Sequence, residues 1–279
     1  MTMIQRNKIT LGNIIIGVIL ALFFLWSVIP VLIVITNSFK ETLDIVKFPP
    51  VFIFEPTIKH YFNALTVGDF SLYFKNSFII AGFTTLISIG CGSMAAYGIL
   101  IMKSRFGDYA SSYLLIGRLV PAITILIPFF SIMTMMGLNR TYIGPILAHC
   151  SINLPFVTWL LMGFMRAIPK EIFESAMIDG ASRMRAFIQI LFPLLLPAIG
   201  SSLILSMQYS WNELLFSLQL TSMNSYTLPV GIAKFVGSIS VEWGRGCAAA
   251  TMTMVPIIIL GFIMQKYLVA GMTAGSVKE

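Results

Sequence analysis

Long uncharged apolar stretches constrain the fold of this sequence more than any other feature. No residue from Leu11 to Ile35 is charged, and about 20 such residues let a helix cross the hydrocarbon layer of a bilayer. Only helices and closed barrels satisfy their backbone in lipid, and these stretches lack the alternation of barrel strands. The sequence therefore predicts an all-α, polytopic membrane bundle of about six transmembrane helices. The expected spans are 11–36, 76–102, 109–136, 143–165, 192–220 and 247–268, in a single transmembrane domain covering residues 1–279.

The composition agrees with a lipid environment. Hydrophobic residues make up 57% of the chain and charged residues 10%, whereas a soluble domain carries about 25% charged residues. The net charge of +7 comes from basic residues in the short segments between apolar stretches. No basic cluster in these segments has the aromatic interleaving of a nucleic-acid surface. The expected surroundings are therefore a lipid bilayer, with no nucleic-acid partner.

The distribution of Lys and Arg orients the chain, because cytoplasmic loops of membrane proteins are enriched in both. Ten of the 18 basic residues fall on the side of the two termini and seven on the other side, while Arg118 lies inside an expected span. The seven are spread over longer loops. We therefore expect both termini to face the cytoplasm, with the loop 37–75 outside and the loop 166–191 inside.

The loop 166–191 contains a short helix whose two ends are marked. Pro169 suits a first helical turn, Glu171 and Glu174 lie near the positive end of the helix dipole, and Gly180 supplies the left-handed residue that ends a helix. One stripe of the helix is apolar and consists of Ile172, Phe173, Ala176 and Met177. Such a stripe is expected to be buried on the chain's own bundle, on the membrane surface or in a groove of a partner.

The same loop resembles the permeases of bacterial ABC importers. Their cytoplasmic loop carries Glu-Ala-Ala, three residues, Gly, nine residues and Ile-x-Leu-Pro. This chain has Glu174-Ser175-Ala176, then Gly180, then Ile190-Leu191-Phe192-Pro193 at the same spacing. Ser175 replaces Ala and Phe192 replaces Leu, and both changes are mild in size.

Further segments are similar to the carbohydrate-uptake branch of these importers, which contains the maltose-type permeases. The similarity extends from Glu55-Pro56-Thr57 to the end of the chain. The segments that carry it are Met177-Ile178-Asp179-Gly180-Ala181-Ser182, Asn153-Leu154-Pro155-Phe156, Ser210-Trp211-Asn212-Glu213 and the tail from Ala270 to Lys278.

The resemblance implies a function and a set of partners. The loop helix would be the coupling helix that docks in a groove of a cytoplasmic ATPase. The chain would be a multi-pass protein of the bacterial inner membrane. It would form a pathway for a sugar or sugar-like solute with a second permease, above an ABC ATPase dimer and fed by a soluble substrate-binding protein. The implied coupling residues are Glu174, Ser175, Ala176, Met177, Asp179, Gly180, Ala181 and Ser182.

The absence of a nucleotide-binding motif indicates that another polypeptide hydrolyses ATP. The chain has no Gly-x-x-x-x-Gly-Lys-[Ser/Thr], the loop that cradles nucleotide phosphates. We therefore expect ATP and Mg to be bound by the partner ATPase, and no catalytic, cofactor or metal site in this chain. A self-contained secondary transporter is an alternative, but such a protein shows interrupted helices in repeated halves. A multi-span membrane enzyme is another, but it would gather acids and histidines at one membrane face, and the eleven acids here are scattered.

Polar side chains inside the expected spans are candidates for the pathway, because they are costly at membrane depth. Gln208, Trp211 and Asn212 share a helical face, and an indole beside amides suits a sugar. His149 and Asn153 lie four residues apart in another span. Structural roles are the alternative: Trp211 as an interfacial anchor, Asn212 joining helices, and Arg118 extending to the interface. The candidate pathway residues are Gln208, Trp211, Asn212, Glu213, Arg118 and Asn153.

Overall fold

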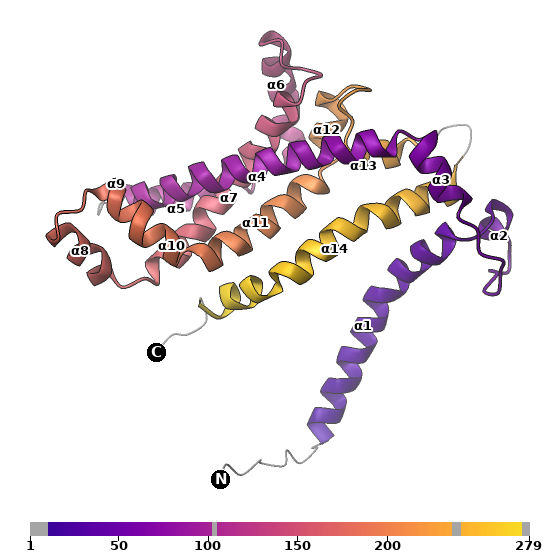
Figure 1. The fold of residues 1–279 in the computed structure, drawn as a ribbon, viewed down its shortest axis with the longest axis horizontal. Coiled ribbons are helices and arrows are strands. Elements are labelled where there is room, and N and C mark those ends of the chain that lie inside the picture. The colour runs from indigo at the N-terminus through magenta and orange to yellow at the C-terminus, as the bar shows by residue number, and fades with distance from the viewer. Residues whose placement is uncertain (1–10, 102–104, 236–240, 275–279) are drawn as a thin grey trace. The chain divides into compact units, whose positions relative to one another are not determined.

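A computed structural model describes residues 11–101, 105–235 and 241–274. The basic residues Arg6, Lys8, Lys103 and Lys278 of the orientation argument, and the tail beyond residue 274, lie outside these ranges. The helical elements are α1 (Leu11–Ser38), α2 (Thr42–Val46), α3 (Lys59–Thr66), α4 (Phe70–Ile101), α5 (Arg105–Gly117), α6 (Ala122–Met135), α7 (Ile143–Arg166), α8 (Lys170–Ile178), α9 (Arg183–Ala186), the π-helical turn η1 (Phe187–Leu191), α10 (Phe192–Leu194), α11 (Leu196–Trp211), α12 (Leu215–Leu220), α13 (Leu228–Ala233) and α14 (Trp243–Ala274) (Figure 1).

Several of these helices have the length and apolar character of membrane spans. In the described residues there are four continuous ones, and a fifth if the bent pair Arg183–Leu194 and Leu196–Trp211 counts as one span. The four are Gly12–Ser38, Phe70–Ile101, Ile143–Arg166 and Trp243–Gln265. The predicted all-α, polytopic membrane bundle is confirmed.

The stretch 109–136 is divided, although the sequence predicts one continuous span. The helix α5 ends at Gly117, the chain turns at Arg118, and α6 begins after Pro121. Proline disfavours helical backbone in the residue before it, and Gly117 has a low helix propensity. The resulting α6 has 14 residues, fewer than the roughly 20 that a perpendicular span needs.

The stretch 192–220 is also interrupted. The helical segments on either side of Leu195 meet at an angle of 74°. Pro193 and Pro197 flank this bend, and each lacks the N–H that an uninterrupted helix would use. The helix α11 then ends at Trp211, and α12 starts separately at Leu215.

The contacts within the chain group into two compact units. Among the described residues, the larger unit lies within Leu65–Lys234 and Thr253–Glu279, and the smaller unit lies within Met1–Ala64 and Phe235–Met252. The single domain over residues 1–279 stays a prediction.

The core of the larger unit lies where α4, α7 and α11 pack against one another. Gly92 lets α4 approach α7 closely, since a Cβ there would lie 3.1 Å from Val157 Cγ1 and 3.3 Å from the backbone nitrogen of Thr158. The main buried apolar cluster consists of Ile89, Ala96, Val157, Leu161, Met162, Met165, Phe187, Leu191, Leu195 and Ala198. These three helices form the frame on which the candidate site is built.

The smaller unit contains part of the long loop that the sequence places outside the membrane. His60 of α3 is buried, and its Nε2 lies 2.9 Å from the carbonyl oxygen of Lys40. A Cβ at Gly244 would fall 2.2 Å from the His60 ring. The first turn of α14 therefore packs directly on α3 at a position where only glycine fits.

Candidate functional site

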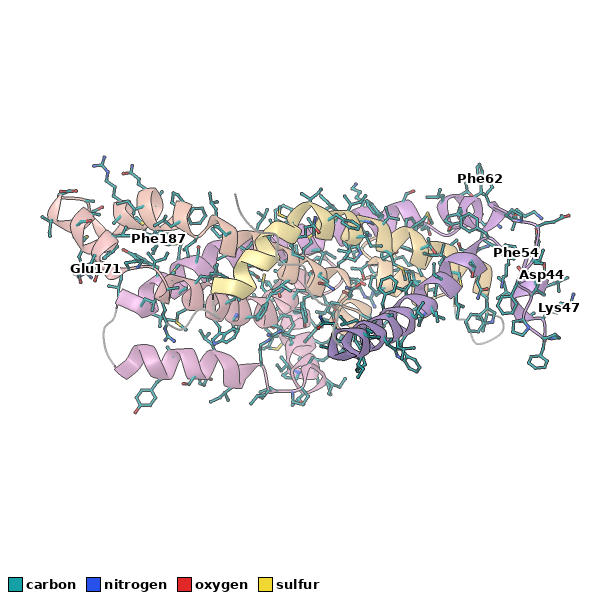
Figure 2. All side chains as sticks on the ribbon, turned by 90° about the horizontal axis from the view of Figure 1, so that it is seen from below. Asp44, Lys47, Phe54, Phe62, Glu171 and Phe187 are labelled. Carbon is teal, nitrogen blue, oxygen red and sulfur yellow. The ribbon has the colours of Figure 1, made fainter. Side chains whose placement is uncertain are left out.

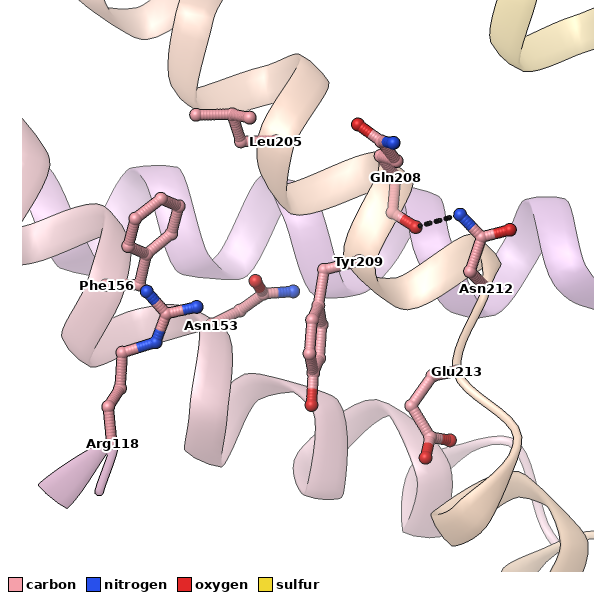
Figure 3. Close-up of a pocket in the computed structure, with 8 residues that line it drawn as sticks. All are labelled: Arg118, Asn153, Phe156, Leu205, Gln208, Tyr209, Asn212 and Glu213. Carbon is pink, nitrogen blue, oxygen red and sulfur yellow. Dashed lines mark hydrogen bonds between the residues drawn. The ribbon is translucent and has the colours of Figure 1, made fainter. Parts of the chain in front are cut away.

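A cavity of about 420 Å³ lies in the larger unit between α7, α11 and the turn that follows α5. Figure 3 shows its lining, to which both polar and aromatic side chains contribute. The lining residues are Arg118, Asn153, Phe156, Leu205, Gln208, Tyr209, Asn212 and Glu213. The structure thus brings together five of the six candidate pathway residues from three separate parts of the sequence.

The sixth candidate, Trp211, does not line this cavity. Its side chain is 1% exposed, and its indole N–H donates to the carbonyl oxygen of Thr253 in α14, at 3.3 Å. The ring of Phe74 from α4 meets the indole edge-to-face, with 5.6 Å between centroids. A buried indole with a hydrogen-bond partner and an aromatic neighbour stabilises helix packing. The placement of Trp211 therefore fits a structural role.

Three lining residues are absent from the sequence-based candidates: Phe156, Leu205 and Tyr209. Phe156 follows Asn153 by three residues on α7, so helical spacing alone would have placed both on one face. Leu205 and Tyr209 are four residues apart in α11, so helical spacing places them on one face as well. A search for polar side chains finds the amides but overlooks the aromatic and aliphatic surface beside them.

Arg118 provides the positive charge of the cavity. Its guanidinium lies over the ring of Phe156, 4.2 Å from the centroid (Figure 3), a distance at which cation–π attraction operates. Among the described residues, no carboxylate forms an ion pair with it. Its position in the turn between α5 and α6 keeps the charge outside a regular helix.

Glu213 provides the negative charge, and both of its oxygens are engaged by the protein. Oε1 accepts from the backbone N–H of Phe216 at 2.8 Å. Oε2 accepts from the backbone N–H of Ser217 at 3.0 Å and from its hydroxyl at 3.1 Å. These bonds satisfy the first amides of α12, which have no partners inside the helix. The carboxylate therefore stabilises the start of α12 as well as lining the cavity.

His149 of α7 contacts Glu213 but is not among the residues that line the cavity. It is fully buried, and its Nε2 is 2.9 Å from Glu213 Oε2 while its Nδ1 is 2.6 Å from Ser210 Oγ. The pair of His149 and Asn153, four residues apart, thus has divided roles. Asn153 lines the cavity and donates from Nδ2 to the carbonyl oxygen of Ser206 at 3.2 Å. His149 instead has hydrogen-bond partners in Glu213, Ser210 and Ser217.

The predicted loop helix is present as α8, and Gly180 ends it. Gly180 has φ +84°, its N–H donates to the carbonyl of Met177 at 3.2 Å, and the N–H of Ala181 donates to the carbonyl of Ala176 at 3.0 Å. This pair of bonds is the Schellman arrangement. The next helix, α9, begins at once, because Ser182 Oγ accepts from the N–H of Arg185 at 3.3 Å.

The apolar stripe of α8 is divided between two environments. Phe173 is half-buried against Tyr97 of α4, with 5.8 Å between ring centroids, and Ala176 is buried. Ile172 and Met177 remain partly exposed, and the neighbouring Ile178 is 85% exposed. One part of the stripe therefore rests on the chain's own bundle, and the other part is left uncovered.

Tyr97 joins the loop to the bundle, which no sequence pattern indicated. Its hydroxyl donates to the carbonyl oxygen of Arg183 at 2.6 Å, and its ring stacks on Phe187 with centroids 4.7 Å apart. Figure 2 labels Phe187 and Glu171 at this end of the larger unit. A single side chain of α4 thus contacts α8, the start of α9 and η1.

The family follows from comparison with known proteins. The family described as binding-protein-dependent transport system inner membrane component matches residues 88–274, which is more than half of the chain. This chain belongs to that family. The interpretation of the sequence as an ABC importer permease is confirmed, and the match supports neither the secondary transporter nor the membrane enzyme.

Curated relatives resemble the permease along nearly its whole length. It is 30% identical over 279 residues to the trehalose/maltose transport system permease protein MalG of Thermococcus litoralis, covering 99% of this chain and 98% of that protein. It is 32% identical over 254 residues to the melibiose/raffinose/stachyose import permease protein MelC of Bacillus subtilis, covering 90% and 91%.

A solved structure shares the fold of the permease. A chain in the crystal structure of a bacterial ABC transporter involved in the import of the acidic polysaccharide alginate superposes with a TM-score of 0.79 at 19% identity, covering 94% of this chain and 99% of that chain. The family match makes the permease a transport subunit of the bacterial inner membrane, and its several apolar helices make it a multi-pass protein.

Proposed function

We propose that this permease forms, with a second permease, the pathway for a sugar or sugar-like solute, and that the cavity beside Arg118 lies on that pathway. The observation that carries the proposal is the lining itself. Asn153, Gln208 and Asn212 supply amide donors and acceptors, and Phe156 and Tyr209 supply aromatic surface. Sugars present hydroxyls at their edges and C–H groups on their faces, so a cavity of this composition suits them. The transport of sugars by relatives points in the same direction.

The transport cycle that we propose divides the chemistry among subunits. A soluble binding protein delivers the solute, and a cytoplasmic ABC ATPase dimer binds ATP and Mg and hydrolyses the nucleotide. This permease supplies half of the pathway and one coupling helix. Both of its termini face the cytoplasm in this proposal, as the distribution of Lys and Arg indicates.

We infer that α8 is the coupling helix and that its uncovered side meets the ATPase. Ile172, Met177 and Ile178 provide exposed apolar surface, and exposed apolar patches mark interaction sites. Phe173 and Ala176 pack α8 against the bundle, so a displacement of α8 by the ATPase would be transmitted to α4 through the contact between Phe173 and Tyr97. The exposed Glu174, Ser175 and Asp179 lie beside the apolar patch and would form its polar rim.

The cavity is tested by uptake in cells that carry the complete transporter. Labelled trehalose, maltose, melibiose and raffinose serve as probes. Gln208→Ala and Tyr209→Ala should raise the KM for the imported sugar without loss of the second permease or the ATPase on co-purification. The matched control is Gln219→Ala, which changes an exposed glutamine of α12 outside the cavity lining. Unchanged KM in both cavity variants would contradict the proposal.

The orientation is tested by thiol labelling. Lys59→Cys and Lys170→Cys should label from opposite sides of the membrane, with Lys170→Cys on the cytoplasmic side. Labelling of both positions from one side would refute the proposed topology.

A further inference from the structure

The junction between α11 and α12 contains a buried polar cluster that the family match does not explain. It consists of His149, Ser210, Glu213 and Ser217, which are contributed by α7, the end of α11, the connecting segment and α12. His149 Nε2 is 2.9 Å from Glu213 Oε2 and 3.4 Å from Ser217 Oγ. The side chain of Glu213 is only 7% exposed and that of His149 is not exposed at all.

The hydrogen bonds of the cluster are mutually consistent. An ionised Glu213 can only accept, so His149 donates from Nε2 to the carboxylate. His149 Nδ1 is then an acceptor for the hydroxyl of Ser210 in the neutral ring. Every polar atom of the imidazole has a partner, and a satisfied buried network holds its members in one arrangement. The tautomer and the rotamer of His149 are thereby fixed.

Glu213 is the member of this cluster that also faces the cavity. It follows Asn212, whose φ of −94° and ψ of 0° mark the end of α11, and it precedes α12. The direction in which the chain leaves α11 therefore depends on where the carboxylate is held. The positions of the lining residues Gln208 and Asn212 depend on the same junction, since Asn212 Nδ2 donates to the backbone carbonyl oxygen of Gln208 at 3.0 Å (Figure 3).

We propose that His149 is a positioning residue for transport. By donating from Nε2 to Glu213, it fixes the junction of α11 and α12 and so sets the shape of the cavity in which the solute binds. The inference rests on the proposed function, because it assumes that the cavity lies on the pathway. His149 does not contact the solute in this account and acts through Glu213 alone.

Two substitutions of His149 separate this role from general packing. Glutamine places its Nε2 amide at about the reach of the histidine Nε2, so His149→Gln keeps the donor to Glu213. Asparagine is one methylene shorter and mimics only Nδ1, so His149→Asn keeps a partner for Ser210 and loses the donor to Glu213. Because both variants are neutral amides in a buried site, the comparison isolates the contact with the acid.

Uptake kinetics of the complete transporter give the first measurement, with trehalose, maltose, melibiose and raffinose as probes. We expect His149→Asn to raise KM about tenfold, as for the loss of a buried hydrogen bond to a charged group, with Vmax within about twofold. His149→Gln, which keeps the donor to Glu213, should stay near the unaltered protein. A fall in Vmax that follows the amount of assembled complex, with KM constant, would show a merely structural role and overturn the proposal.

Thiol accessibility gives a second measurement that needs no solute. In the purified complex, Asn212→Cys reports on the junction by its rate of reaction with a maleimide. His149→Asn should change this rate severalfold and His149→Gln should not. Equal rates in the two variants would overturn the role of His149 whatever sugar the transporter carries.

The two proposals fail in different ways. If Gln208→Ala and Tyr209→Ala leave KM unchanged, the cavity is not on the pathway and the proposed function falls. If those variants raise KM but His149→Asn and His149→Gln behave alike in both measurements, only the role of His149 is wrong.

Discussion

Replacement of Tyr97 tests how the loop helix is joined to the membrane bundle. The side chain makes three separate contacts: a hydrogen bond to the Arg183 carbonyl at 2.6 Å, a stacked contact with Phe187 and an edge contact with Phe173. Tyr97→Phe removes only the first, and Tyr97→Ala removes all three. The two variants therefore divide the hydrogen bond from the ring contacts.

The expected costs differ severalfold. The hydrogen bond is reached by solvent, so its loss should cost about 0.5 kcal/mol, the low end for a hydrogen bond in proteins. Each aromatic pair contributes about 0.5–1.5 kcal/mol beyond its burial, and truncation of a buried aromatic residue to alanine costs about 3–5 kcal/mol. Because Tyr97 is only half-buried, we expect about 3 kcal/mol for Tyr97→Ala. This corresponds to roughly a hundredfold shift between docked and released states of the loop.

The assay compares ATPase co-purification, ATP hydrolysis and solute uptake for the same complex. Tyr97→Phe should keep uptake near that of the unaltered transporter. Tyr97→Ala should keep membrane insertion but lose uptake, with ATP hydrolysis that no longer responds to the loaded binding protein. Coupled uptake at the normal rate in Tyr97→Ala would refute the reasoning that α8 acts on the bundle through this residue.

Three further predictions concern single contacts. Gly180→Leu should uncouple hydrolysis from uptake, because it places a side chain at φ +84° at a cost on the order of 1 kcal/mol; normal uptake and normal ATPase binding would contradict the coupling role of the loop. Gly231→Ala should lower the free energy of unfolding of the purified complex by about 1–3 kcal/mol, because its Cβ would lie 2.1 Å from Tyr73 Cδ2. Gly163→Ala is the matched control and should be neutral or stabilising, because its Cβ would have no atom within 4 Å beyond its chain neighbours and the backbone of its own helix. Trp211→Ala should reduce assembly and uptake in equal proportion. Loss of uptake without loss of assembly would contradict the structural role of Trp211 and support a role in the pathway.

Local signals allowed the sequence to predict the loop helix closely. Pro169, Gly180 and Ser182 act through their own backbone geometry or through hydrogen bonds within three residues, so their effects are visible without tertiary structure. Gly180 does have the left-handed backbone that was expected, and α8 has the expected extent. What the sequence could not predict is the partner of the stripe, because Phe173 contacts Tyr97, which lies 76 residues earlier in the chain.

The candidate cavity was predictable in part for a related reason. A polar side chain in an apolar stretch is conspicuous whatever surrounds it, so Arg118, Asn153 and Glu213 could be identified from position alone. Helical spacing also grouped Trp211 with Gln208, but spacing does not show which neighbour occupies each side of a helix. The side of α11 that carries Trp211 faces Phe74 and Thr253, and only the packing of α4 and α14 reveals this.

The two interrupted spans connect the fold to the proposed function. Backbone that leaves a helix at membrane depth has unpaired polar groups, and it is tolerated only where protein buries it or where it lines a cavity. The break between α5 and α6 carries Arg118, and the break between α11 and α12 carries Glu213; both side chains line the same cavity. At the second break, backbone N–H groups find a partner within the chain, because Glu213 caps α12 and is held by His149. A hydropathy average over about 20 residues describes each stretch as one span, because the few residues at each break change the average little. These same residues include Arg118 and Glu213, which place opposite charges at the cavity wall.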